Sequence, residues 1–116
     1  IVTVGRHADD LSDQWNAAAR YTEAYYLHGF ATQCAEALAE HIHQRIRREL
    51  GIPEDQGRRY SWGYPACPDL AEHEKLFRLL PGPRASITLT AGYQLMPEQS
   101  TAAMVTHHPQ SKYFSA

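Results

Sequence analysis

The chain has 116 residues, 43% of them hydrophobic, and its 11 lysine or arginine residues against 13 aspartate or glutamate residues give a formal net charge of −2 at pH 7. Such a length suits a single domain that buries a core without disulfides or a metal. The absence of a basic stripe excludes the usual nucleic-acid-binding classes, and the apolar runs are far shorter than the roughly 20 residues that cross a bilayer. We therefore expect a single domain over residues 1–116, no nucleic-acid or membrane partner, and a cytoplasmic location.

The first half of the chain is predicted to be helical after a short opening strand over residues 1–5. Apolar residues recur at helical intervals from Asp9 to about Arg20, and acidic residues at the start suit the positive end of a helix dipole. A longer helix is predicted to begin near Tyr21 and to end before Gly51. Its apolar positions are Ala31, Cys34, Ala35, Leu38, Ile42 and Ile46, which would leave Glu36, Glu40, His43 and Arg47 on another face.

The second half is predicted to contain one further helix and then strands. Asp69 and Glu72 form a variant capping box ahead of the helix, and residues 81–83, Pro-Gly-Pro, end it. Residues 85–90 alternate apolar with polar side chains, and residues 100–105 are weakly β-like, which predicts two strands joined through residues 96–99. Another strand is predicted to begin at residues 113–114.

Short connections between these strands favour antiparallel pairing over a βαβ crossover. The predicted fold class is therefore α/β in its α+β form, with N-terminal helices followed by a mainly antiparallel sheet.

An irregular segment over residues 59–69 is the strongest candidate for a binding site. Its guanidinium, Arg59, has the planar fork that binds a carboxylate or phosphate through two hydrogen bonds, although most arginines are simply solvated at the surface. Tyr60, Trp62 and Tyr64 alternate, so they either present flat faces to an aromatic ligand or plug the edge of a core. Gly63 permits a positive φ in a loop that the neighbouring prolines stiffen.

Other reactive side chains give no pattern that predicts chemistry. The pairs His41/His43 and His107/His108 do not converge on one face of a helix or strand, so we expect no metal site. Cys67 lies between Ala66 and Pro68 with no base placed by the sequence, so we expect it to be structural and expect no catalytic residue.

Three segments carry a resemblance to a known family. Residues 35–40 (AEALAE), 63–68 (GYPACP) and 108–114 (HPQSKYF) resemble, in this order along the chain, the activation domain of cobalamin-dependent methionine synthase. The resemblance implies a portion of a domain that binds S-adenosylmethionine and docks over a cobalamin-binding module. It also implies a role in the reductive methylation of inactive cob(II)alamin, with an electron from a flavodoxin-type donor. Such a domain is part of a methyltransferase and is not expected to be catalytic alone.

The resemblance also assigns the binding residues. Arg59 falls on the family's carboxylate-binding arginine, and Ser61 on a position whose backbone contacts the adenine end of the ligand. The residues implied for cofactor binding are Glu36, Arg59, Ser61, Gly63, Tyr64, Tyr113 and Phe114. In this assignment Gly63 and Tyr64 line the ligand and face the corrin, Glu36 receives a hydroxyl or the cationic end, and the pair at 113–114 closes over the ligand. The alternative is a non-catalytic module that docks on a corrinoid protein without binding S-adenosylmethionine.

Overall fold

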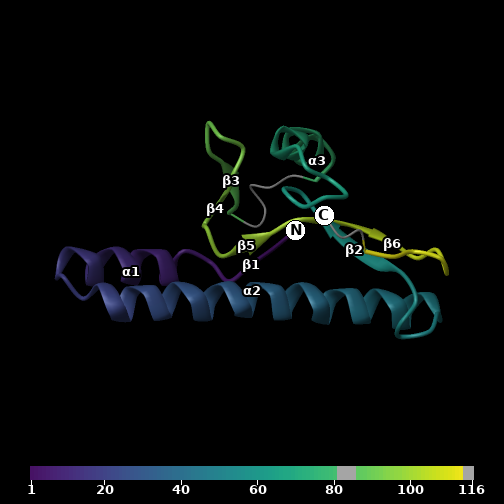
Figure 1. The fold of residues 1–116 in the computed structure, drawn as a ribbon, viewed down its shortest axis with the longest axis horizontal. Helices are drawn as coiled ribbons and strands as arrows, with labels where there is room; N and C mark the ends of the chain where they lie inside the picture. The colour runs from purple at the N-terminus through teal and green to yellow at the C-terminus, as the bar shows by residue number, and fades with distance from the viewer. Residues whose placement is uncertain (81–85, 114–116) are drawn as a thin grey trace.

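A computed structural model gives the structure of the protein over residues 1–80 and 86–113. The long helix α2 (Tyr21–Leu50) runs along the longest axis of the molecule, and the other elements lie along one side of it (Figure 1). Its 30 residues span about 45 Å, close to the 50 Å extent of the chain. Helix α1 (His7–Ala17) folds back along the N-terminal part of α2. None of the helices in the described ranges is long and apolar enough to cross a membrane.

The ends of the first two helices follow from backbone geometry. Helix α2 begins at the predicted residue and ends at Gly51, which adopts a left-handed φ of 66° while the N–H of Ile52 donates to the carbonyl of Arg47. Helix α1 ends three residues earlier than predicted, because Ala19 also has a positive φ of 58° and the chain reverses there. This reversal lays α1 against α2.

The face of α2 that the strands cover differs from the predicted apolar face. Its buried residues are Ala24, Ala31, Ala35, Ala39, His43 and Arg47. Small alanine side chains let the strands β1 and β5 pack close to the helix axis. Ile42 is 36% exposed, so the prediction that it faces the core while His43 and Arg47 lie elsewhere is wrong. The C-terminal half of the covered face is therefore polar.

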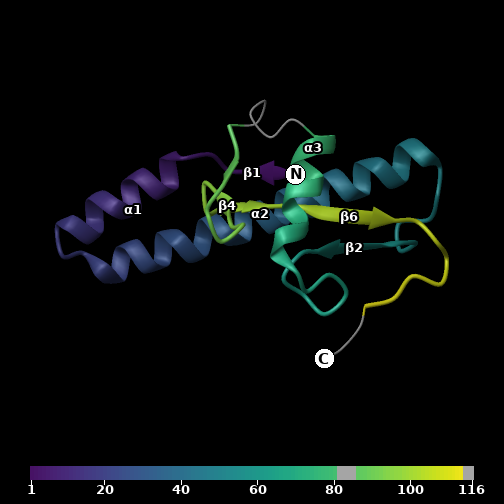
Figure 2. The same cartoon turned by 90° about the horizontal axis from the view of Figure 1, so that it is seen from above.

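The described strands form three two-stranded antiparallel ladders. They are β1 (Val2–Thr3), β2 (Arg58–Ser61), β3 (Thr88–Leu89), β4 (Leu95–Met96), β5 (Ser100–Thr101) and β6 (Ala103–Thr106). The pairs are β1 with β5, β3 with β4, and β2 with β6 in the register Arg58↔Thr106 to Ser61↔Ala103. Figure 2 shows β2 and β6 side by side, and Figure 1 shows both strands above α2. The α+β class and the antiparallel pairing are confirmed.

Two predictions about the strands are wrong. The strands at residues 85–90 and 100–105 do not pair with each other in the described residues. Instead β3 pairs with β4, β5 pairs with β1 near the N-terminus, and β6 pairs with β2 in the middle of the chain. The start of the segment 59–69 is not irregular but lies in β2. No strand includes Tyr113, and Phe114 lies outside the described residues.

The third helix begins as its cap predicted. The side chain of Asp69 accepts a hydrogen bond from the N–H of Ala71 at 2.9 Å, which starts the 3-10 turn η1 (Leu70–Glu72) that leads into α3 (His73–Leu79). Glu72 does not complete the capping box but pairs with Lys75. The predicted stop at residues 81–83 lies outside the described residues.

Gly57, where the chain enters β2, tolerates no side chain. It has a φ of 81°, and a Cβ there would collide with the carbonyl oxygen of Thr106 and lie 2.9 Å from the Cα of His107. We expect Gly57→Ala to lower the free energy of unfolding by about 2–4 kcal/mol, from backbone strain and overpacking. The matched control is Gly51→Ala, where φ is also positive but the site is open, with an expected loss of about 1 kcal/mol. Urea denaturation of the two variants checks this, and equal losses would contradict it.

His43 makes the stability of the chain depend on pH. Its ring is 1% exposed, and burial together with the charge of Arg47 lowers its pKa below the ordinary value of 6.5. Below about pH 6.5 the unfolded chain therefore binds a proton that the folded chain excludes, so acidification lowers the free energy of unfolding. We expect a fall between pH 7.5 and 5.5 in urea denaturation, and a smaller fall in His43→Gln. The exposed neighbour His41→Gln is the control, and a full pH effect in His43→Gln would refute the assignment.

Candidate functional site

A pocket of about 320 Å³ lies where β2, α2 and the C-terminal segment meet. It is lined by Glu36, Arg59, Tyr60, Ser61, Tyr64, Pro65, Ala66 and Tyr113. Five of the predicted cofactor-binding residues are thus brought to one cavity, whose volume is within the range of small-molecule sites. Phe114 lies outside the described residues, and Gly63 adjoins the pocket through Tyr64.

Arg59 is held by two acids on successive turns of α2. Its Nη1 donates to Oε2 of Glu40 at 2.8 Å, and its Nη2 lies 3.4 Å from Oε2 of Glu36. The side chain of Arg59 is only 15% exposed, so it is not the solvated surface arginine of the alternative interpretation. The strand fixes the backbone of Arg59 through its pairing with Val105. A guanidinium with one edge at the pocket can receive a carboxylate there.

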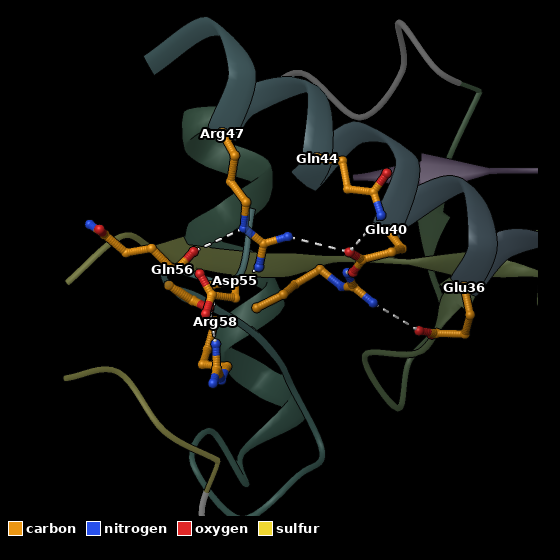
Figure 3. Close-up of polar contacts among 9 residues, drawn as sticks. Glu36, Glu40, Gln44, Arg47, Asp55, Gln56 and Arg58 are labelled. Carbon is orange, nitrogen blue, oxygen red and sulfur yellow. Dashed lines mark hydrogen bonds and ion pairs between the residues drawn. The ribbon is translucent and has the colours of Figure 1, made fainter. Parts of the chain in front are cut away.

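A second arginine, on α2 itself, also contacts Glu40. Arg47 places its Nη1 3.3 Å from Oε1 of Glu40 and donates from Nε to the carbonyl of Gln56 at 2.9 Å, as Figure 3 shows. Its side chain is 8% exposed, and such a buried cation needs these partners. The Gln56 side chain in turn donates to the carbonyl of His107 at 2.6 Å. These contacts join α2 to both strands of the ladder β2–β6, at the end of the ladder where β2 begins and β6 ends.

The two arginines set the charge of Glu40. Partial burial raises the pKa of this carboxyl, but the hydrogen bond and charge of Arg59, with the charge of Arg47, outweigh burial and bring the pKa below its ordinary value. Glu40 is therefore ionised at neutral pH. The two cations Arg47 and Arg59 and the two anions Glu36 and Glu40 thus form one connected group of ion pairs beside the pocket.

A tight turn presents Tyr64 to the cavity. The N–H of Gly63 donates to the carbonyl of Cys67 at 2.8 Å, and the N–H of Cys67 returns a bond to the carbonyl of Tyr64 at 2.9 Å. Gly63 has a positive φ of 88°, one of the two conformational roles that the sequence left open for it, and a Cβ there would lie 3.3 Å from Leu70. The hydrogen-bonded turn leaves the ring of Tyr64 66% exposed, so its faces are free for a flat ligand.

The sequence left open whether the aromatic residues of the segment 59–69 face a ligand or plug the edge of a core. Both cases occur in the structure. Tyr60 lies at the pocket, where its hydroxyl donates to the carbonyl of Lys112 at 2.6 Å and its ring meets that of Tyr113 edge to face with centroids 6.0 Å apart. Trp62 packs instead against the ring of His73, with centroids 5.3 Å apart. Trp62 and His73 line a neighbouring cavity of about 480 Å³ that shares Glu36, Ser61 and Tyr64 with the pocket.

The sequence did not single out Glu40 or Arg47 as parts of the site. Glu40 has a signal, since it is four residues from Glu36 and must share its side of the helix. Arg47 repeats the same spacing after His43, but a polar residue on a helix is ordinarily taken as exposed. Among the described residues no group of three or more histidine, cysteine, aspartate or glutamate side chains is arranged to hold a metal ion.

The arrangement suits a zwitterion attached to a flat group. Arg59 supplies the donors for a carboxylate, Glu36 can accept from an ammonium group or a hydroxyl, and the tyrosine rings offer apolar faces beside them. The turn at Gly63 keeps the backbone next to the cavity without a side chain of its own.

Comparison with known proteins identifies relatives over the whole chain. Residues 1–116 match the family described as "Vitamin B12 dependent methionine synthase, activation domain". The methionine synthases of Mycobacterium tuberculosis and Mycobacterium leprae are 38% and 37% identical over 99% of this chain. The chain spans only 11% of the length of each of these relatives.

A solved structure agrees in fold. The crystal structure of the MetH reactivation domain bound to AdoHcy superposes with a TM-score of 0.86 at 30% identity, covering 97% of this chain and 39% of that one. The conserved architecture therefore extends over nearly all of the residues compared. On these matches the chain belongs to the family of vitamin B12 dependent methionine synthase activation domains.

Proposed function

We propose that this chain binds S-adenosylmethionine in the pocket beside Arg59 and so supports the reductive methylation of cob(II)alamin. The observation that carries the proposal is the part-buried Arg59 beside Glu36 at a cavity of about 320 Å³. A related solved domain, 30% identical, is bound to AdoHcy, the demethylated form of the same compound. The amino-acid end of either compound carries both charges for which the pocket has partners.

In the proposed complex each end of the ligand meets a different part of the pocket. The carboxylate lies against Arg59, and Glu36 accepts from the ammonium group or a ribose hydroxyl. The adenine end lies near the backbone of Ser61, with Tyr64 and Tyr113 beside it. Gly63 faces the corrin together with Tyr64, and Phe114 joins Tyr113 in closing over the ligand.

The proposed contribution to the reaction is positional. Cobalamin, held by the cobalamin-binding module of a methionine synthase, would supply the cobalt that takes up an electron from a flavodoxin-type donor and the methyl group of S-adenosylmethionine. Holding the methyl donor in place converts a bimolecular step into an effectively unimolecular one. This can lower the activation free energy by up to about 7–11 kcal/mol. We propose further that residues 1–116 act as one domain, in the cytoplasm, with no catalytic residue of their own.

A second candidate is a module that docks on a corrinoid protein without binding the ligand. It is favoured by the contacts of Arg59, whose two Nη atoms already face Glu40 and Glu36. In this alternative Glu36 closes the pocket permanently, and the charged group has only a structural role.

Binding of S-adenosylhomocysteine to the purified chain separates the two candidates. We expect saturable heat in isothermal titration, and we expect Arg59→Ala to weaken the affinity roughly 10- to 150-fold, because hydrogen bonds to a charged group contribute about 1.5–3 kcal/mol. The matched control is Arg45→Ala, which removes the same charge from an exposed position of α2 that pairs with Glu49. Its affinity should equal that of the unchanged chain.

The outcomes distinguish the candidates directly. A folded chain that gives no heat with S-adenosylhomocysteine or S-adenosylmethionine supports the docking module. Equal losses in Arg59→Ala and Arg45→Ala would show a general charge effect and would remove Arg59 from the site.

A further inference from the structure

We propose that Glu40 is a positioning residue that fixes the guanidinium of Arg59, whereas Glu36 is an exchangeable partner that a ligand carboxylate replaces. The inference rests on the proposed function and assigns different roles to two acids that the sequence presents alike, four residues apart on α2.

The two contacts of Arg59 are unequal. The distance from Nη1 to Glu40 is 2.8 Å, that of a charge-assisted hydrogen bond, while the distance from Nη2 to Glu36 is 3.4 Å. Glu36 lines the pocket and Glu40 does not. The shorter contact, with Glu40, therefore lies outside the pocket lining, and the longer one, with Glu36, lies where a ligand would enter.

The two acids also differ in how firmly they are held. Glu40 receives Arg59 on Oε2 and both Arg47 and the amide of Gln44 on Oε1, each at 3.3 Å (Figure 3). Glu36 has the contact with Arg59 alone among the residues that the structure describes. Replacing Glu36 thus breaks one long contact, and replacing Glu40 would release three donors.

Glu40 is anchored to the backbone through Arg47. Besides its bond to Gln56, Arg47 has its Nη2 3.4 Å from the carbonyl of Gly57, and both acceptors lie directly before β2. The carboxylate of Glu40 is consequently fixed relative to the strand that carries Arg59. A guanidinium held in this way loses less freedom when a carboxylate binds, which favours affinity.

The charges at the site balance both without a ligand and with one bound. The free site has two cations, Arg47 and Arg59, and two anions, Glu36 and Glu40. A ligand with one carboxylate and one ammonium group adds one of each sign. The ligand carboxylate takes the pocket edge of Arg59, Glu36 becomes available to the ammonium group, and no charge is left without a partner.

The test compares Glu40→Gln in the 116-residue chain with two probes. We expect the affinity for S-adenosylhomocysteine to fall about tenfold or more. The affinity for 5′-methylthioadenosine, which lacks the amino-acid end, should not change. A variant that merely loosened the fold would weaken both probes equally, and that outcome would overturn the proposal.

A double-mutant cycle with Arg59→Ala tests whether Glu40 acts through the arginine. In the Arg59→Ala background, Glu40→Gln should have no further effect on the affinity for S-adenosylhomocysteine. Additive losses would show that Glu40 acts independently of Arg59 and would contradict the proposed role.

The positioning can also be measured without a ligand. In ¹⁵N-labelled chain, the Arg59 side-chain resonances, assigned with Arg59→Lys, should show slow rotation of the guanidinium that persists in Glu36→Gln and is lost in Glu40→Gln. Fast rotation in the unchanged chain refutes the positioning role even if Glu40→Gln does not fold. If rotation is slow but S-adenosylhomocysteine does not bind, the proposed function fails while the positioning of Arg59 by Glu40 stands.

Discussion

The carboxylate of Glu40 between the guanidinium groups of Arg59 and Arg47 is the interaction on which the rest of the site depends. It is the point where the long helix and the strand β2 are joined by side chains rather than by backbone. Toward its N-terminus α2 packs against α1, and β1 and β5 pack against it farther along, on a face whose buried residues are alanines, which permit close packing but do not fix a direction. Toward its C-terminus the same face turns polar, and its side chains have specific partners. The direction of β2 relative to the helix is therefore set at the polar end.

The polar contacts at the C-terminal end of α2 fix the position of β2 more than they stabilise the fold. Pairs between exposed side chains contribute little, and burying a cation costs free energy that its partners must offset. Arg47, 8% exposed, is satisfied only because the chain delivers the carbonyls of Gln56 and Gly57 to it. The entry to β2 also requires Gly57, because the backbone there has a positive φ and passes too close to Thr106 for any side chain. One glycine and one arginine thus place the strand that carries Arg59.

Local signals predicted much of this arrangement, and the parts that they missed are non-local. The ends of α2 and the cap at Asp69 each depend on a few neighbouring residues, and Arg59 was singled out by the chemistry of its fork and by family resemblance. Strand pairing was mispredicted because β1 and β2 find their partners about a hundred and about fifty positions away. No local pattern encodes such distances. The burial of Arg47 was missed because periodicity counts a polar side chain as exposed, whereas two of its acceptors, the carbonyls of Gln56 and Gly57, come from outside the helix.

The strand β2 explains how one short segment builds both walls of the pocket. Successive side chains of a strand point to opposite sides. Arg59 accordingly reaches the acids of α2, while Arg58 and Tyr60 contact the C-terminal segment, where the guanidinium of Arg58 lies 5.7 Å from the ring of Tyr113. The wall on the α2 side is bound by ion pairs, and the aromatic wall leaves Tyr64 and Tyr113 66% and 64% exposed. In the proposed complex the charged end of the ligand would therefore meet groups that are already held in place, and the flat end would meet exposed aromatic rings that the ligand itself would bury.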